Sequence, residues 1–103
     1  MAYNFEFGED ALKEWKKLDS SVKNQLLKIF ERRLQEPRIP SAALSGMPDC
    51  YKIKLRKACV RLVYRVQDKK LLIQVIAIGK RDKSTIYAAA VSRLQELLAK
   101  EKK

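Results

Sequence analysis

The stretch between residues 50 and 66 constrains the fold most, because its side chains alternate between apolar and basic in two successive segments. The alternating side chains are, in chain order, Tyr51, Lys52, Ile53, Lys54, Leu55 and Arg56, then Arg61, Leu62, Tyr64, Arg65 and Val66. A period of two residues is typical of β-strands, whose successive side chains point to opposite faces. The pattern therefore predicts two neighbouring strands.

A turn centred on residues 57–58 would join these strands into a β-hairpin. In that register Lys54 lies directly opposite Arg61, and Lys52 lies opposite Val63. One face of the hairpin is then apolar, and the other carries a row of cations. We call Lys52, Lys54 and Arg61 on this second face the cationic floor.

The charge of the hairpin is one-sided, since six Lys or Arg lie between Asp49 and Asp68 with no acidic residue among them. Like charges placed opposite each other destabilise a sheet by up to roughly 1 kcal/mol per pair. An external polyanion would compensate for this repulsion, and the phosphates of nucleic acid bind clustered Lys and Arg whatever the base sequence. The alternative is a solvated face on a basic protein. The absence of acid along the whole hairpin favours the polyanion.

The composition indicates one small globular domain over residues 1–103, with 47% hydrophobic and 34% charged residues. A net charge of +11 points to an anionic partner, which could be RNA, DNA, an acidic protein or an anionic membrane. No apolar run approaches the roughly 20 residues that span a bilayer, and the N-terminus lacks a signal-peptide pattern. We therefore expect a cytoplasmic protein that does not insert into a membrane.

The two cysteines, Cys50 and Cys59, are expected to be free thiols, as is usual in the cytoplasm. In the predicted hairpin they are about 20 Å apart, whereas a disulfide needs Cα atoms within about 7 Å. Two cysteines and no histidine also argue against a zinc site.

The residues before the hairpin predict a strand followed by two helices. Residues 2–7 alternate as a strand would, and helical spacing begins at Glu9. Asp19-Ser20 separates the two helices, and Pro37 and Pro40 end the second. The apolar stripes of the helices are Ala11, Leu12, Trp15 and Leu18 in the first, and Val22, Leu26, Ile29, Phe30 and Leu34 in the second.

The residues after the hairpin predict a buried strand and a last helix. Residues 71–78 are apolar on both faces, which suits the middle of a sheet, and the chain leaves this strand over residues 79–83. Ser84 can cap a helix with Tyr87, Ala90, Val91, Leu94 and Leu98 on one side. Residues from about 95 to 103 are expected to fray as a basic tail.

The resulting order is β-α-α-β-β-β-α, which predicts an α+β fold with a small, mostly antiparallel sheet of about four strands. The N-terminal helical hairpin should cover one face of this sheet. The cationic floor would then lie on an open face, bordered by Arg81 after the central strand and by Tyr87 in the last helix.

Five short motifs occur in a set order: Leu44-Ser45-Gly46, Tyr51-Lys52-Ile53-Lys54-Leu55-Arg56, Arg61-Leu62-Val63-Tyr64, Gly79-Lys80-Arg81 and Tyr87. Together they resemble the RelE family of bacterial type II toxins, and the likeness extends over nearly the whole chain to about Leu94. It implies a ribosome-dependent endoribonuclease that cuts mRNA in the ribosomal A site without a metal or other cofactor. It also implies two partners, a cognate RelB-like antitoxin and the ribosome with its mRNA.

Carried over by motif, the resemblance implies an active site of Lys52, Lys54, Arg61, Arg81 and Tyr87. Lys54 matches the favoured general base, and Arg81 matches a general acid or leaving-group stabiliser. Lys52 and Arg61 match phosphate contacts, and Tyr87 matches a residue that orients the substrate. The chain departs from the family at the hairpin turn, where Val60 replaces an aromatic residue and Ala58-Cys59 replaces a glycine-containing pair.

The chemistry can also be weighed from the residues, because a chain without histidine cannot use an imidazole pair. A lysine that acts as base near pH 7 needs a pKa well below its usual value of about 10.4. Like charges on Lys52, Arg56 and Arg61 would lower the pKa of Lys54, whereas substrate phosphate would raise it. Lys54 could instead stabilise charge, and arginine is a better phosphate clamp than proton donor.

Three alternative interpretations remain open. Tyr87, taken alone, could be a packed aromatic side chain at the start of a helix. The whole chain could be a toxin of the related ParE kind, which poisons DNA gyrase and lacks this set of lysines and arginines, or an RNA-binding module without catalysis. The five active-site residues favour the nuclease over the ParE-like toxin and over the RNA-binding module.

Overall fold

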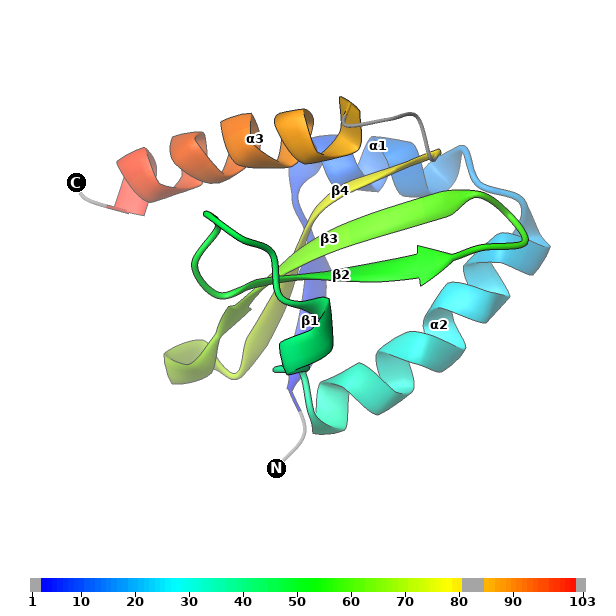
Figure 1. Cartoon of the computed structure of the whole chain (residues 1–103), viewed down its shortest axis with the longest axis horizontal. Coiled ribbons are helices and arrows are strands. Elements are labelled where there is room, and N and C mark those ends of the chain that lie inside the picture. Colours follow the sequence, from blue (N-terminus) through cyan, green and yellow to red (C-terminus); the bar gives the residue numbers. More distant parts are fainter. Residues whose placement is uncertain (1–2, 81–84, 102–103) are drawn as a thin grey trace.

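A computed structural model describes residues 3–80 and 85–101 of the chain. The elements, shown in Figure 1, are β1 (Asn4–Phe7), α1 (Glu9–Lys16), α2 (Ser20–Gln35), η1 (Pro40–Ala42), β2 (Cys50–Leu55), β3 (Val60–Gln67), η2 (Asp68–Lys70), β4 (Leu72–Lys80) and α3 (Thr85–Glu101). Here η marks a single 3₁₀ turn. The predicted α+β fold and the order of strands and helices are both confirmed.

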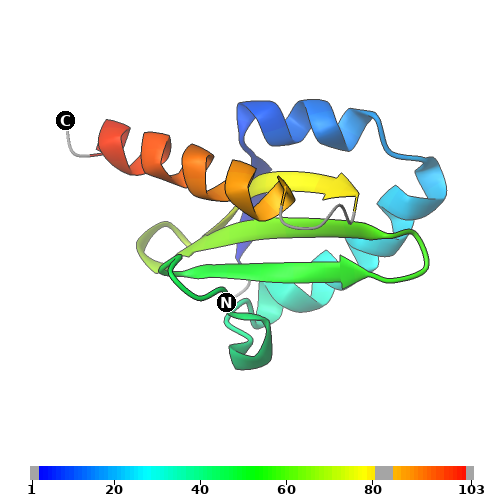
Figure 2. The ribbon, with the colours of Figure 1, turned by 45° about the horizontal axis from the view of Figure 1, so that its top comes forward.

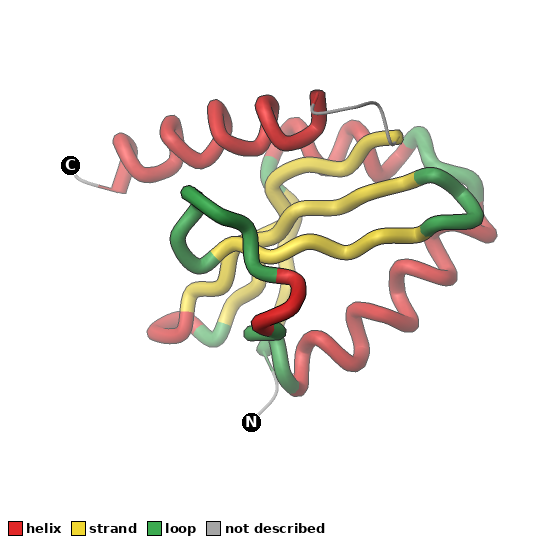
Figure 3. Tube along the Cα trace, in the orientation of Figure 1, coloured by secondary structure: helices red, strands yellow, loops and turns green. Residues whose placement is uncertain are grey.

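The four strands form one sheet in the order β1-β4-β3-β2 (Figure 3). β1 runs parallel to β4, and the other neighbours are antiparallel. The predicted hairpin register is confirmed, since Lys54 pairs with Arg61 and Lys52 with Val63. The central place of β4 between β1 and β3 is confirmed as well.

A bulge in β4 interrupts the alternation of its side chains between the two faces of the sheet, both of which are covered by hydrophobic clusters. Val63 pairs with Ala77 and Tyr64 pairs with Val75, so Ile76 is an extra residue in β4. A bulge breaks the strict alternation of side chains. Ile76 and the adjacent Ala77 consequently pack in the same hydrophobic cluster, which lies on the opposite face from Val75.

The first hydrophobic cluster joins the helical hairpin to one face of the sheet. Leu26 and Phe30 of α2 are buried there, together with Tyr51 and Tyr64 from the hairpin. In α1 the predicted stripe is wrong at one position, because Ala11 is the buried residue and Leu12 is 38% exposed. An eight-residue helix has only two turns, and its sequence does not show which of two adjacent positions faces the sheet.

The second cluster lies on the other face of the sheet, beneath α3. Ile86, Ala90 and Leu94 of α3 pack there against Val63 and Ile76, so α3 covers part of the face expected to be open. Figure 2 shows α3 running past β4, apart from the helical hairpin. The predicted stripe of α3 is wrong in part, since Val91 and Leu98 are exposed. This helix has apolar residues on most of its sides, so periodicity alone does not show which side of the helix faces the sheet.

The predicted frayed tail is also wrong within the described residues, because α3 continues to Glu101. The carboxylate of Glu101 accepts two hydrogen bonds from Arg65 of β3, at 2.6 and 2.8 Å. This ion pair ties the end of α3 to the sheet, across a sequence separation that helical periodicity does not reveal. Lys102 and Lys103 lie outside the described residues.

Both cysteines are free, as predicted, with Cys50 buried and Cys59 exposed. Over the described ranges, no three His, Cys, Asp or Glu side chains gather in a way that could hold a metal ion. None of the helices in those ranges is both long enough and apolar enough to cross a membrane.

Candidate active site

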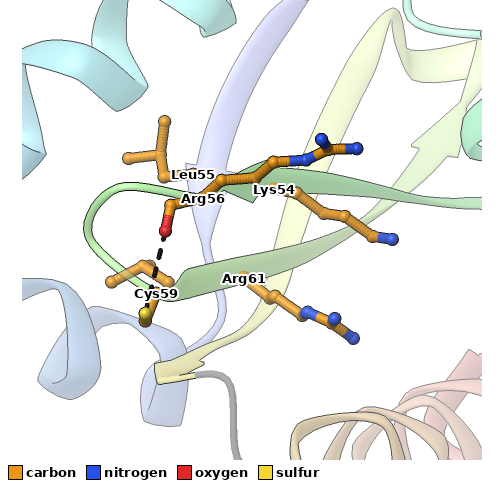
Figure 4. Close-up of a pocket in the computed structure, with 6 residues that line it drawn as sticks. Lys54, Leu55, Arg56, Cys59 and Arg61 are labelled. Atoms are coloured by element: carbon orange, nitrogen blue, oxygen red, sulfur yellow. Dashed lines mark hydrogen bonds between the residues drawn. The ribbon is translucent and has the colours of Figure 1, made fainter.

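The cationic floor is built by the hairpin between β2 and β3. Lys54 and Arg61 face each other across the two strands, and their side chains leave the strands in the same direction (Figure 4). They border a hollow of about 280 Å³ near the turn, whose other lining residues are Leu55, Arg56, Cys59 and Val60. The floor therefore has space beside it for a ligand, and that space is lined on one side by cations.

Tyr87 is brought to this floor by α3. The Arg61 Nη1 donates a hydrogen bond of 3.0 Å to the Tyr87 hydroxyl oxygen, and the guanidinium carbon lies 5.6 Å from the centre of the ring. Tyr87 is half-buried and also packs against the second hydrophobic cluster. It is thus a packed aromatic residue and a neighbour of the floor at once, so the two interpretations of Tyr87 do not exclude each other.

Lys54 lies in a strongly positive environment. The pKa of its ammonium group is lowered from its usual value, chiefly by the charge of Lys52 and then by that of Arg61, with further contributions from desolvation and from Arg56. The direction agrees with the sequence-based expectation. A lower pKa increases the fraction of Lys54 that is neutral and able to accept a proton near pH 7.

No carboxylate neutralises this group of cations among residues 3–80 and 85–101. The ion pairs found there involve Arg38, Arg65 and Arg93 instead. A phosphate entering the hollow would consequently meet cations that are not already engaged with carboxylates of the described chain.

Arg81, the fifth predicted site residue, lies outside the described residues. β4 continues through Lys80, two residues beyond Ile78, where the strand was predicted to end. Gly79 pairs with Arg61, and a Cβ atom built on it would lie 3.4 Å from the Ile86 Cδ1. A methyl group at this position would make ordinary van der Waals contact with Ile86, so the packing of α3 does not require glycine here.

The turn of the hairpin has an unusual backbone at Cys59, whose φ is 54°. This left-handed conformation suits glycine, and here it occurs where the sequence departs from the glycine-containing turn of the resembled family. The hairpin register is nevertheless regular from Leu55 and Val60 onward. Despite this departure, Lys54 and Arg61 keep their predicted pairing.

One residue that supports the site was missed by the sequence analysis. Arg33 of α2 donates from Nη1 to the Tyr64 hydroxyl oxygen (2.6 Å) and to the backbone carbonyl oxygen of Lys52 (3.3 Å). The Tyr64 hydroxyl in turn donates to the carbonyl oxygen of Pro37 at 2.6 Å. This network fixes the outer strand at Lys52 from behind the floor, and no local sequence pattern marks its long-range partners.

Comparisons with known proteins agree with this arrangement. The family model described as ParE toxin of type II toxin–antitoxin system, parDE, matches residues 5–85. The mRNA interferase toxin RelE of Escherichia coli K12 is 53% identical over 94 residues, which cover 91% of this chain and 99% of that protein. The chain belongs to the RelE/ParE toxin family, and within it to the RelE proteins.

Solved structures of RelE share the fold of this RelE-family protein. A doubly substituted E. coli toxin RelE in the free state superposes with a TM-score of 0.83 at 53% identity, over 90% of this chain and 98% of that one. The toxin chain of the intact E. coli RelBE toxin–antitoxin complex superposes with a TM-score of 0.76 at 52% identity, over 80% of this chain and 100% of that one. The resemblance inferred from the five motifs is therefore confirmed.

Proposed function

We propose that this RelE-family protein is the toxin of a type II toxin–antitoxin system and a cytoplasmic endoribonuclease that cuts ribosome-bound mRNA in the A site. The observation that carries the proposal is the cationic floor, where Lys54 has a lowered pKa beside Arg61 and Tyr87. The name mRNA interferase on a relative that is 53% identical supports the same activity.

The reaction assigned to this floor is attack by the substrate's own 2′-hydroxyl. Lys54 in its neutral form removes the proton of that hydroxyl, and the 2′-oxygen bonds to the adjacent phosphorus as the bond to the 5′-oxygen breaks. Lys52 and Arg61 bind the non-bridging phosphate oxygens, on which negative charge grows. Arg81 would stabilise or protonate the leaving 5′-oxygen, and Tyr87 would orient the nucleotide beside Arg61.

The openness of the site accounts for the proposed dependence on the ribosome. In-line attack needs the 2′-oxygen, the phosphorus and the 5′-oxygen held nearly in line, and such restraint contributes several kcal/mol to catalysis in well-ordered sites. The hollow beside Lys54 is about 280 Å³ and is lined by six residues of a single hairpin, so it offers one wall for an RNA chain. A ribosome that already holds the codon would supply the remaining restraint.

A RelB-like antitoxin is the proposed partner that keeps the toxin inactive. Support comes from the RelBE complex of a relative that is 52% identical, and from the net charge of +11, which favours an acidic partner. The proposed inhibitor either covers the cationic floor or displaces α3, which carries Tyr87.

The experiment that tests this function analyses the ends of the cleaved RNA. The toxin is incubated with ribosomes programmed with a defined mRNA, and with the same mRNA free in solution. We expect rapid cuts inside the A-site codon, leaving a 2′,3′-cyclic phosphate upstream and a 5′-hydroxyl downstream, and very slow cutting of free mRNA. A 2′-O-methyl group at the cut position should abolish cleavage, and EDTA should not, provided that the ribosomes keep their structural magnesium.

Several outcomes would contradict the proposal. Products with a 5′-phosphate, or efficient cutting of the 2′-O-methyl substrate, would exclude attack by the 2′-hydroxyl. Equal rates on free and ribosome-bound mRNA would exclude ribosome dependence. Intact mRNA together with inhibited DNA gyrase would identify the ParE kind of toxin instead, and intact mRNA with tight RNA binding would identify a module without catalysis.

A further inference from the structure

The central strand β4 extends beyond the strand beside it. β1 ends at Phe7, which pairs with Val75, so among the described strands the rest of β4 has no neighbour on that side. Two backbone groups of this segment bond to side chains instead. The Ile78 N–H donates to Glu14 Oε1 at 3.0 Å, and the Ile76 carbonyl oxygen accepts from Arg93 Nη1 at 3.0 Å.

Glu14 and Arg93 also bind each other. Arg93 Nη1 lies 2.8 Å from Glu14 Oε1, and Nη2 donates to Oε2 at 3.2 Å, which makes the pair bidentate. Asp10 lies farther away, 3.7 Å from Arg93 Nε. The side chains of Arg93 and Glu14 are only 24% and 32% exposed, so this pair is less screened by solvent than a surface pair.

The pair connects two helices that pack on opposite faces of the sheet. Glu14 belongs to α1, whose Ala11 lies in the first hydrophobic cluster, and Arg93 belongs to α3, which packs in the second. Besides the Arg61–Tyr87 hydrogen bond, α3 packs on the sheet in this region through the apolar side chains of Ile86 and Ala90. Apolar contacts have little directional preference, whereas the hydrogen bonds at Ile76 and Glu14 fix where along β4 the helix lies.

The position of α3 matters because this helix carries Tyr87. Arg93 follows Tyr87 by six residues, roughly 9 Å along the helix axis, so a shift of α3 at Arg93 moves the ring as part of the same rigid element. The bond from Arg61 to the Tyr87 hydroxyl is 3.0 Å long and would be lost after a small displacement. We infer that Glu14 and Arg93 are positioning residues for RNA cleavage, which hold α3 on the edge of β4 so that Tyr87 stays beside Arg61.

This inference rests on the proposed function, and a double-mutant cycle with Tyr87 tests it. The rate at saturating ribosome–mRNA complex is measured for the wild type, Arg93→Met, Tyr87→Phe and the double variant. Arg93→Met should lower this rate by about 10- to 100-fold, as expected when a reacting group is misplaced. In the Tyr87→Phe background it should lower the rate less than twofold, because the hydroxyl that it positions is already absent.

Matched variants separate positioning from general loosening of the helix. Glu101→Gln removes the other ion pair of α3, fourteen residues beyond Tyr87, and should change the rate less than twofold. Glu14→Gln should reproduce the effect of Arg93→Met, and Arg93→Lys, which keeps the charge but not the bidentate geometry, should recover part of the rate. Circular dichroism and urea unfolding identify any variant that does not fold, in which case the cycle is run with Glu14→Gln.

A second measurement needs no RNA cleavage. The ring signals of Tyr87 are followed by NMR in protein with ¹³C-labelled tyrosine, assigned by their loss in Tyr87→Phe. They should shift in Arg93→Met and Glu14→Gln and stay in place in Glu101→Gln. Equal losses of rate in both Tyr87 backgrounds, or unchanged Tyr87 signals, would overturn the inference. If the wild type cut no RNA, the proposed function would fail, and the NMR result would still decide whether the pair positions Tyr87.

Discussion

The two ends of the β2–β3 hairpin use basic residues in opposite ways. At the end away from the turn, Arg38 pairs with Asp49 at 2.9 Å and with Asp68 at 2.7 Å, and Arg65 pairs with Glu101 at 2.6 Å. Each of these arginines connects segments that are distant in the sequence. The basic residues at this end therefore hold the fold together.

At the turn end, Lys52, Lys54 and Arg61 face one another, and none of them pairs with a carboxylate in the portion that the structure describes. Their mutual repulsion lowers the pKa of Lys54 and leaves the floor available to phosphate. The same residue types thus stabilise the protein where they are paired and, under the proposed function, serve chemistry where they are not. Substitutions at the two ends should separate stability from activity.

The largest effect is expected at Lys54. Lys54→Ala should lower the single-turnover rate of mRNA cleavage by about 10²- to 10⁴-fold, the usual contribution of a general base. The wild-type rate should rise with pH until it passes the lowered pKa of Lys54, because only the neutral amine accepts a proton. In Lys54→Ala the rate should be lower, and it should also no longer increase with pH. Single-turnover rates measured across the pH range check both expectations.

The same substitution should leave the fold intact. Removal of one ammonium relieves repulsion across the strands, so the midpoint of urea unfolding should be unchanged or slightly higher. Arg61→Ala provides the matched test on the neighbouring strand, with lower activity and an undiminished midpoint. Unfolding of either variant would mean that the residue is structural, and a parallel drop of the rate at every pH would mean that Lys54 stabilises charge instead of accepting a proton.

A smaller effect is expected at the paired end. Arg38→Gln should lower the free energy of unfolding by about 1 kcal/mol at low salt, since two exposed ion pairs are lost, and by less in 1 M salt. Its cleavage rate should stay within twofold of the wild type. A large loss of activity without a loss of stability would show that Arg38 belongs to the floor.

At acid pH, the free energy of unfolding of Arg38→Gln should differ less from that of the wild type than it does at pH 7. Arg38 and then Tyr3 bond to the carboxylate of Asp68 and hold its pKa below the ordinary value of 3.8. A lowered pKa in the folded state stabilises the protein above the ordinary pKa, and this contribution is lost as pH falls through the lowered value. Urea unfolding of both proteins between pH 7 and pH 2 checks this sign.

The smallest effect is expected in the turn. Cys59→Gly should raise the free energy of unfolding by about 0.5 kcal/mol, because glycine adopts the φ of 54° without steric cost but gives up more entropy on folding. Ala58→Gly is the control, since Ala58 does not have a positive φ, and it should be neutral or destabilising. A loss of stability in Cys59→Gly would show that the weak 3.7 Å contact of its sulfur with the Arg56 carbonyl oxygen matters more than the strain.

The sequence predicted the hairpin well because its pattern is local. The alternation at Lys52, Lys54 and Arg61 fixes the face of each side chain, and the facing pair followed from the turn. The apolar run of β4 likewise predicted its central place. These features depend on residues that are close in the chain.

The parts that sequence reasoning missed depend on residues far apart in the chain. Glu14 and Arg93 are separated by 79 positions, and Arg33 and Lys52 by 19. Neither pair produces a periodic signal. Glu101 likewise lies in a run of charged residues, and nothing in that run indicates its bond with Arg65. The cationic floor was therefore predictable, whereas the contacts that hold it and Tyr87 in place were not.

The pairing of β1 with β4 has a consequence for how the protein is made. Asn4 pairs with Leu72, so β1 meets its strand partner in the described sheet only after residue 72 has been translated. Such contacts of high sequence separation form late and slow folding. Tyr87 comes later still, on the last helix. Under the proposed function, a nascent chain presents Lys54 and Arg61 before Tyr87 has been added, and the toxin becomes competent only after α3 has been translated.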